Sequence, residues 1–302
     1  MKKTVRLFSI MAVIVAGCTT ACGQNAIKNT ANDSGKVKVM TSFYTMYDFA
    51  QKIGGEKVEI TNMVPSGTEP HDWEPSAIDI RNMEDADVFI YNGAGMEHWA
   101  EDILKSLDNS ELITVEASEG VELIREGKEN DPHVWLDPEN AKIEMEHIKD
   151  AFIEADKDNA EYYNKNYETY SRQLDGLNQE FEETLSQVTN KDIIVAHKAF
   201  GYLCKAYGLN QIAIEGLMPD SEPDPARMEE IIQLAKKKEI NTIFFEELVS
   251  PKVANTIAKE IGAKTEVLNP LDGLSEEQMD AGEDYFSVMR TNLKQIKKAL
   301  EN

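Results

Sequence analysis

The segment from Asp158 to Val188 has the pattern of one long amphipathic helix. It contains no proline and one glycine, Gly176. Apolar or aromatic side chains recur every three or four residues, which places them on one face of an α-helix. A helix of this length would extend roughly 46 Å at about 1.5 Å per residue. The recurring positions are Ala160, Tyr163, Tyr167, Tyr170, Leu174, Leu177, Phe181, Leu185 and Val188.

Short β-rich runs alternate with helical patterns on both sides of this segment. Such alternation predicts parallel sheets flanked by helices. Four β-rich runs precede the segment and four follow it, so we expect two four-stranded sheets. The expected strands are Val37–Met40, Val58–Val64, Asp87–Tyr91, Leu112–Val115, Asp192–Ala196, Gln211–Ile214, Thr242–Phe245 and Thr265–Leu268. The expected helices include 44–53, 96–107, 139–154, 198–207, 225–238 and 251–261.

The fold class predicted by this order is α/β, with two lobes that each hold a mostly parallel four-stranded sheet flanked by helices. A length of 302 residues also suggests about two domains. We expect an N-terminal lobe over 36–138, a helix and the long bridging helix over 139–190, and a C-terminal lobe over 191–302. A helix that crosses both lobes would make their link rigid. The alternative is a helix that packs within one domain.

The N-terminal residues have the pattern of an export signal. A basic start is followed by an apolar stretch over 7–16, which is too short to span a membrane. The sequence over 15–18, Val-Ala-Gly-Cys, then resembles the lipobox of bacterial lipoproteins, where cleavage leaves a cysteine that carries a lipid. The basic residues are Lys2, Lys3 and Arg6.

This pattern predicts a lipoprotein signal peptide over 1–17, lipidation of Cys18 and a flexible tether over 18–35. The mature protein would then be extracytoplasmic and anchored by lipid to the outer face of a bacterial cell membrane. An ordinary signal peptide is one alternative. Cleavage before Cys22 is another, although the residues before Cys22 match a lipobox less well.

The charge and the cysteines exclude several classes of function. The chain has 31 Lys and Arg residues against 55 Asp and Glu residues, a formal net charge of −24. Because a surface this acidic repels phosphate backbones, nucleic-acid binding is not expected. The three cysteines form no CxxC pair, which excludes zinc fingers and thioredoxin-type chemistry. The negative charge favours cations at long range, but charge alone does not make a site.

Three of the five histidines lie in loops whose positions suggest a common site. His71 and His197 each follow a predicted strand, one in each lobe, and ligands of open α/β sheets collect beyond the carboxyl ends of strands. His133 lies in the loop over 131–138, and Asp272 follows the last predicted strand. Three imidazoles and one carboxylate suit tetrahedral zinc, although imidazole also suits copper, iron and nickel. From spacing alone, a loop histidine is more often a surface residue than a metal ligand.

Six segments carry a family resemblance: PSGTEPHDWEPSAIDI, ADVFIYNGAGMEHW, DPHVWLDPENA, IVAHKAFGYLCKAYGL, FFEELVSPKVANTIAKEIG and EDYFSVMRTNL. They resemble the zinc-uptake substrate-binding proteins of ABC transporters, which belong to a class of zinc- and manganese-binding lipoproteins. The similarity runs from about residue 36 to residue 300, in order and without a large gap. It implies two α/β lobes bridged by a rigid helix, in agreement with the periodicity.

The resemblance also implies a set of metal ligands. The histidines of PHDWEPS, DPHVWLDP and HKAFGY match the family's ligand positions, and they are His71, His133 and His197 here. The third position resembles a glutamate in manganese-binding relatives, so a histidine there favours zinc over manganese. The carboxylate that relatives carry after the last strand aligns best with Asp272, although some relatives use water instead.

The neighbouring Glu246 and Glu247 are competing carboxylates for the fourth position, and either could accept a hydrogen bond from an imidazole N–H. We expect His98 on the surface or in an ordinary polar contact, and His147 on a solvated helix face. The region over 119–130 contains no histidine, whereas many zinc-binding relatives carry a loop rich in His and Asp there. If that loop captures metal in relatives, this chain lacks or replaces the step.

These features predict a protein that captures Zn²⁺ in a cleft between its lobes and delivers the ion to an ABC permease for import. We expect the protein to be a monomer. We expect no enzymatic activity, because no HExxH motif occurs and four protein ligands leave no open coordination position. Binding of manganese or another divalent metal is the main alternative. A surface adhesin is a second alternative, and a zinc-dependent hydrolase is a more distant one.

Overall fold

The structure is a computed structural model that describes residues 35–219 and 224–301. The predicted signal peptide and the predicted lipidation site at Cys18 lie outside these residues, as does nearly all of the predicted tether. Within the two described ranges, none of the helices combines the length and hydrophobicity of a membrane-spanning segment.

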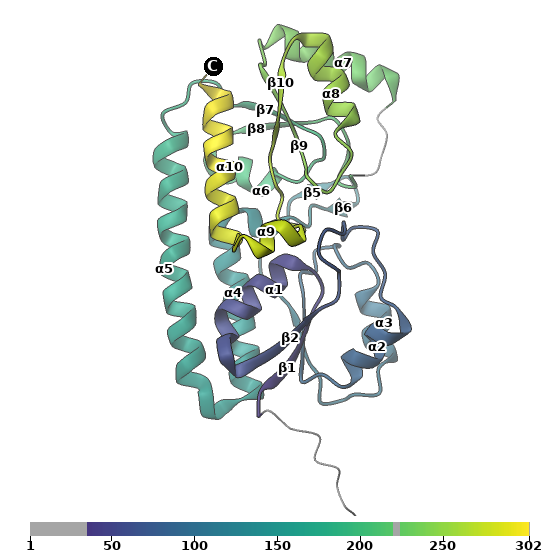
Figure 1. The fold of residues 1–302 in the computed structure, drawn as a ribbon, viewed down its shortest axis with the longest axis vertical. Coiled ribbons are helices and arrows are strands. Elements are labelled where there is room, and N and C mark those ends of the chain that lie inside the picture. Colours follow the sequence, from purple (N-terminus) through teal and green to yellow (C-terminus); the bar gives the residue numbers. More distant parts are fainter. Residues whose placement is uncertain (1–34, 220–223, 302) are drawn as a thin grey trace, which may run out of the picture. The chain divides into compact units, whose positions relative to one another are not determined.

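A parallel sheet in the order β2-β1-β3-β4 forms the core of the N-terminal half. Figure 1 shows its strands β1 and β2 beside α1. The inner strands β1 and β3 are largely buried, as expected for parallel strands covered on both faces. Helix α1 packs on β1 and β2, and α4 packs on β3 and β4. The bounds are β1 (Val37–Thr41), α1 (Tyr44–Gly54), β2 (Val58–Asn62), α2 (Ala77–Glu84), β3 (Val88–Tyr91), α3 (Ala100–Ser106), β4 (Ile113–Glu116) and α4 (Pro138–Ala155).

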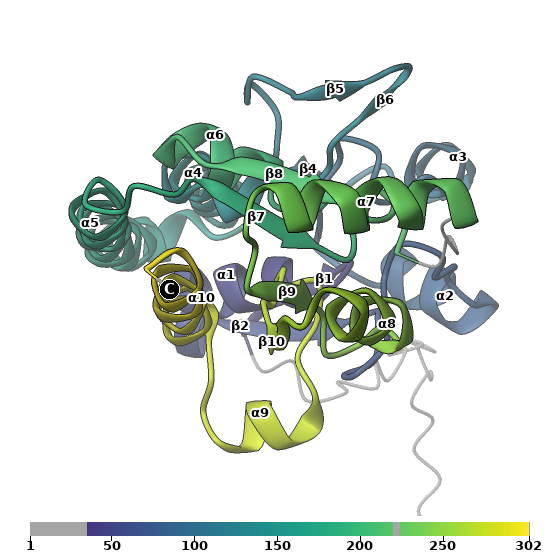
Figure 2. The same ribbon diagram turned by 90° about the horizontal axis from the view of Figure 1, so that it is seen from above.

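A second parallel sheet, in the order β10-β9-β7-β8, forms the core of the C-terminal half. Helix α8 packs on β9 and β10, and α6 packs on β8. Figure 2 shows α7 and α8 beside this sheet, with α9 extending away from it. The bounds are β7 (Asp192–Val195), α6 (Gly201–Tyr207), β8 (Asn210–Ala213), α7 (Pro225–Lys237), β9 (Thr242–Phe245), α8 (Lys252–Ile261), β10 (Lys264–Val267), α9 (Glu276–Asp280) and α10 (Tyr285–Leu300).

The predicted long helix is α5 (Ala160–Leu185), preceded by the short 3-10 helix η3 (Lys157–Asn159). It packs on α1 and α4 beside the first sheet and on α6 and α10 beside the second, and Figure 1 shows it running along both halves. The apolar face predicted from periodicity is the buried face, since Leu174, Leu177 and Phe181 are at most 1% exposed. At about 1.5 Å per residue, α5 is roughly 39 Å long. One helix therefore packs against both halves.

Sequence signals at the helix ends explain where several helices begin. The Asp137 side chain accepts a hydrogen bond from the Glu139 backbone N–H, and Pro138 occupies the first turn of α4. Ser76 and Asp79 form a capping box at the start of α2. Gly208 follows α6 with φ of 66°, a left-handed conformation that glycine adopts without strain.

Some elements were not predicted. The two-residue strands β5 (Arg125–Glu126) and β6 (Glu129–Asn130) form a hairpin within the region over 119–130. Helices α2, α9 and α10 and the 3-10 helices η1 (Gly55–Lys57) and η2 (Val134–Leu136) were also missed. Helix α10 contributes buried Tyr285 and Met289 to the largest core cluster, so its absence from the prediction left out part of the interface with α5.

Candidate metal centre

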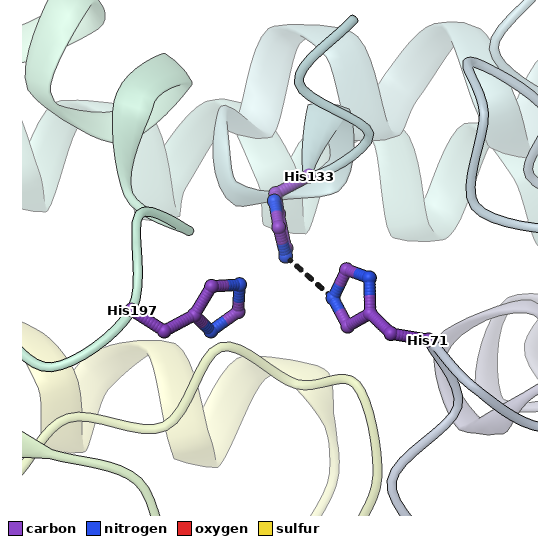
Figure 3. Close-up of side chains that lie close together, drawn as sticks. All are labelled: His71, His133 and His197. Carbon is purple, nitrogen blue, oxygen red and sulfur yellow. Dashed lines mark hydrogen bonds between the residues drawn. The ribbon is translucent and has the colours of Figure 1, made fainter. Parts of the chain in front are cut away.

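Four loops place the predicted site residues between the two sheets. His71 lies in the loop between β2 and α2, and His133 directly precedes η2. His197 lies two residues beyond the end of β7, and Asp272 lies in the loop after β10. The side chains come from both halves and are buried, with no more than 4% exposure for any of the four. Figure 3 shows the three imidazole rings facing one another across a small space.

The distances between the rings match those of ligands to one ion. The ring centroids are 5.1 Å apart for His71 and His133, 5.2 Å for His71 and His197, and 4.8 Å for His133 and His197. The Nε2 atoms of His71 and His133 are 3.2 Å apart. Two nitrogens that bind one tetrahedral zinc ion at the usual bond length are about 3.3 Å apart. This pair therefore already has the spacing of two zinc ligands.

The carboxylate of Asp272 lies close to the same imidazole nitrogens. Its Oδ2 is 4.0 Å from His71 Nε2 and its Oδ1 is 4.0 Å from His133 Nε2. Asp272 Oδ1 and His197 Nε2 are buried, and neither forms a hydrogen bond with any of the described residues. Because an unsatisfied buried polar atom is costly, such atoms call for a ligand. The arrangement is that of a site for a small cation with mixed nitrogen and oxygen ligands.

Carboxylates on the far side of two rings determine which nitrogen faces the site. Asp131 Oδ1 lies 2.7 Å from His133 Nδ1. Glu246 Oε1 and Oε2 lie 2.9 and 3.0 Å from His197 Nδ1. An Nδ1–H that donates to a carboxylate leaves Nε2 as the ring nitrogen that faces the site, and Nε2 can bind a metal once it carries no proton. Glu247 does not take part, since its carboxylate accepts from Asn269 and Gln278.

The loop that carries Asp272 is held by hydrogen bonds to the N-terminal half and by a hydrogen bond within the loop. The Trp135 indole N–H donates to the Pro270 carbonyl at 2.7 Å, and the Thr45 hydroxyl donates to the Leu271 carbonyl at 2.6 Å. The Asn269 side chain accepts from the Leu271 N–H at 2.7 Å. Leu271 itself has φ of 66°, a conformation that a branched side chain rarely adopts. These bonds stabilise an uncommon backbone conformation directly before the carboxylate.

Burial and neighbouring charges act differently on the three imidazoles. Desolvation lowers the pKa of His71 and of His133 well below the usual value, and neighbouring histidines lower both further. Both rings are therefore neutral, which is the form that binds metal. Burial also lowers the pKa of His197, but the charge and hydrogen bond of Glu246, with Asp272 and Glu69, outweigh it and raise this pKa to about 9.

The two buried aspartates have raised pKa values. Desolvation raises the pKa of Asp272 well above its usual value, against the opposing effect of His197. Desolvation likewise raises the pKa of Asp131 to about 7, against its hydrogen bond from the His133 backbone. Burial makes both carboxylates costly as anions. A cation at the site would stabilise the charged form of Asp272.

The other two histidines lie outside the site. His98 is exposed, with Nε2 3.6 Å from a Glu74 carboxylate oxygen, as expected for a surface residue. The prediction for His147 was wrong, because its ring is half-buried and its Nδ1 lies 2.9 Å from the Ala117 carbonyl oxygen. His147 links α4 to the end of β4 and does not lie on a solvated helix face.

Sequence reasoning did not single out Asp131 or Glu69, which lie next to the rings. Each occurs in a local acid-Pro-His motif, two residues before His133 or His71. In both motifs the acid accepts a hydrogen bond from the histidine backbone N–H at 3.1 Å. A carboxylate two residues before His71 and before His133 was the sequence signal that could have found them.

This chain belongs to the family described as zinc-uptake complex component A, periplasmic, whose sequence profile matches residues 39–299. The resemblance seen in the sequence is confirmed. The chain is 41% identical to the high-affinity zinc uptake system protein ZnuA of Bacillus subtilis, over 95% of this chain and 96% of that protein. It is also 38% identical to the zinc-binding lipoprotein AdcA of Streptococcus pneumoniae over its whole length, which spans 62% of AdcA.

A solved structure supports the same assignment. The crystal structure of the Zn(II)-bound ZnuA-like domain of Streptococcus pneumoniae AdcA is similar to this structure, with a TM-score of 0.81 and 41% sequence identity. The similarity covers 89% of this chain and 100% of that domain. The predicted fold class, two parallel four-stranded sheets flanked by helices with one long helix, is confirmed.

Proposed function

We propose that this protein is the extracytoplasmic component of a zinc importer, which captures Zn²⁺ between its two halves and delivers it to an ABC permease. The observation that carries the proposal is the convergence of three buried imidazole nitrogens and a buried carboxylate from four separate loops. The relatives named for zinc uptake and the zinc-bound relative support the same cargo.

In this proposal the Zn²⁺ ligands are Nε2 of His71, His133 and His197 and a carboxylate oxygen of Asp272. Three nitrogens and one oxygen suit tetrahedral zinc better than manganese, which prefers oxygen ligands. Four protein ligands also leave no position for a reactive water. Capture and release therefore fit this site better than hydrolysis, which needs an open coordination position.

The proposal includes a division of the chain by role. Residues 1–17 would be a signal peptide, Cys18 would carry the lipid, and 18–35 would be the tether to the membrane. The two sheets would form lobes over 36–138 and 191–302, with α4 and α5 between them. The support for lipid anchoring is the lipobox-like sequence and a relative named as a lipoprotein.

Delivery would be made by the protein as a monomer that docks on the permease. Because α5 packs against both halves, we expect any opening that releases the ion to be small. The strongly acidic composition supports solubility and raises the local concentration of cations.

Competitive metal titration of the full chain tests this function. The purified metal-free protein is titrated with Zn²⁺ or Mn²⁺ in the presence of a chromophoric chelator, and the bound metal is counted by elemental analysis. We expect one Zn²⁺ per chain, bound at least about 100-fold more tightly than Mn²⁺, in line with the higher affinity of nitrogen ligands for zinc. Tighter binding of Mn²⁺, or no stoichiometric binding of Zn²⁺, would contradict the proposal.

A further inference from the structure

A small acidic cavity adjoins the metal centre on one side. Its volume is about 10 Å³, close to that of one water molecule or one ion. The carboxylates on its wall differ in exposure: Glu247 is exposed, the Glu69 side chain is 18% exposed, and Glu246 and Asp272 are buried. The wall therefore carries carboxylates at successive depths, from the surface to the ligand set.

Glu69 lies on the wall of this cavity, close to His71. Its Oε1 is 4.0 Å from His71 Nε2, while its other oxygen accepts a hydrogen bond from the His71 backbone N–H. Glu69, His71 and Asp272 each offer a ligand atom, and these atoms lie within 4.8 Å of one another. Asp272 Oδ1 is buried and forms no hydrogen bond with the described residues, so an acceptor is available at the same point.

The two acid-Pro-His motifs place their carboxylates on opposite sides of the imidazole. Asp131 lies against Nδ1 of His133, the ring nitrogen that points away from the metal centre. Glu69 has one more methylene group, and its Oε1 is near Nε2 of His71, the nitrogen that faces the metal centre. Glu69 is therefore placed to contact the ion itself, whereas Asp131 is placed to orient a ring.

We propose that Zn²⁺ enters and leaves through this cavity, and that Glu69, His71 and Asp272 hold it transiently outside the final ligand set. This inference rests on the proposed function. In the inward step, the Zn–O bonds to Glu69 and to one solvent water break as Zn–N bonds to His133 and His197 form. The Nε2 proton of His197 passes to solvent water, and the zinc stays Zn²⁺ throughout. His71 and Asp272 belong to both ligand sets. The ion therefore always keeps protein ligands while it exchanges the others.

A second opening reaches the site from another side, but it is a poorer route for a cation. It is a hollow of about 390 Å³ that includes His71 and is lined by Met96, His98, Lys128 and Met218. Glu129 is also on its wall. This hollow is lined by apolar side chains, one lysine and one glutamate. It therefore attracts a divalent cation less strongly than the small acidic cavity, whose wall carries four carboxylates.

Stopped-flow kinetics of the full chain test this inference. Association is followed with a fluorescent zinc indicator, and release is followed after excess chelator is added. We expect Glu69→Gln to slow both association and release by about tenfold or more. Glu69→Asp keeps the charge but withdraws the carboxylate from His71, so we expect a similar slowing. Circular dichroism and the melting temperature establish that both variants are folded.

Two control variants separate a ligand role from a general charge effect. Glu247→Gln removes one charge from the same cavity, and we expect less than a twofold change, which high salt abolishes. Glu129→Gln alters the other opening, and we expect no slowing. Unchanged rates for the Glu69 variants would overturn the inference. Equal slowing by Glu247→Gln or Glu129→Gln would also overturn it.

Two further experimental results would each lead to a different conclusion. If Glu69→Gln speeds release and leaves association unchanged, Glu69 is a permanent ligand and the transient role is wrong. If the wild-type chain binds no Zn²⁺, the proposed function itself fails before the route is tested.

Discussion

The site depends on pairs of residues in which one side chain orients another. His133 and His197 each have a carboxylate at Nδ1, so Nε2 of both rings is directed inward. Removing an imidazole would take away a bond to zinc and leave its carboxylate partner without that hydrogen bond. Substitution of a ligand and substitution of its carboxylate partner should therefore reduce the Zn²⁺ affinity by different amounts.

Replacement of any one of the three histidines by alanine should reduce Zn²⁺ affinity by about 100-fold or more, because one of four zinc bonds is lost. Competitive titration with a chromophoric chelator measures the change. His98→Ala is the matched control, since His98 is exposed and lies outside the site, and its affinity should equal that of the wild type. Full affinity in two of the three variants would end the site hypothesis. The three histidines are His71, His133 and His197.

Loss of an orienting carboxylate should cost less than loss of a ligand. Glu246→Ala should reduce Zn²⁺ affinity by about 10- to 100-fold, because the His197 ring loses the acceptor that fixes its orientation. The neighbouring Glu247→Ala should change affinity by less than about threefold, since Glu247 contacts Asn269 and Gln278 and no imidazole. The same titration applies, and an equal loss in both variants would mean that charge, and not orientation, is responsible.

At the residue scale, sequence reasoning selected the four side chains that the structure brings together, but family resemblance carried much of that choice. Gaps of 62 residues between His71 and His133 and 64 between His133 and His197 give no distance. Their approach depends on the packing of loops from both halves, which local patterns do not describe. Sequence reasoning also left Glu246 and Glu247 equivalent, because adjacent residues of a loop point in different directions only once the backbone is known.

At the element scale, the strands and α5 were predictable because their patterns are local. Each observed strand of the two large sheets lies within two residues of its predicted bounds. Helix α10 was missed although Asp284 forms a capping box with Ser287 at its start. The hairpin of β5 and β6 could not be expected from periodicity, because two-residue strands are shorter than any repeat.

The buried face of α5 should be essential for stability. Phe181 is fully buried and its ring stacks on Tyr207 of α6, with centroids 4.9 Å apart. Phe181→Ala should lower the free energy of unfolding by about 3–5 kcal/mol, because it leaves a cavity between α5 and the C-terminal half. Chemical denaturation monitored by circular dichroism measures the loss.

Glu168→Ala provides the control for this prediction, because Glu168 is on the exposed face of the same helix. The free energy of unfolding of this variant should lie within about 0.5 kcal/mol of the wild-type value. If Phe181→Ala is no more destabilising than Glu168→Ala, then α5 does not hold the halves through this face.

At the scale of the whole molecule, zinc would join two halves whose sheets share no strand. Two ligands, His71 and His133, come from the N-terminal half, and two, His197 and Asp272, come from the C-terminal half. Completion of the final ligand set would therefore tie the two halves together. The affinity should depend on any condition that changes the charge of the ligands.

Zn²⁺ affinity should fall in acid. The pKa of His197 is raised to about 9, so below that pH zinc must displace a proton from this ring. The apparent affinity should therefore rise by about tenfold per pH unit between about pH 6 and pH 8, as expected when one proton is released on binding. Competitive titration at several pH values measures this slope. An affinity that does not change over this range would contradict the ligand set.

Anomalous X-ray diffraction from zinc-loaded crystals shows directly whether one zinc ion is bound by ligands from both halves. Data collected on both sides of the zinc absorption edge should give one strong peak per chain. We expect this peak about 2.0–2.2 Å from Nε2 of His71, His133 and His197 and from a carboxylate oxygen of Asp272. A zinc peak bound by ligands from one half alone, or located away from these rings, would contradict it.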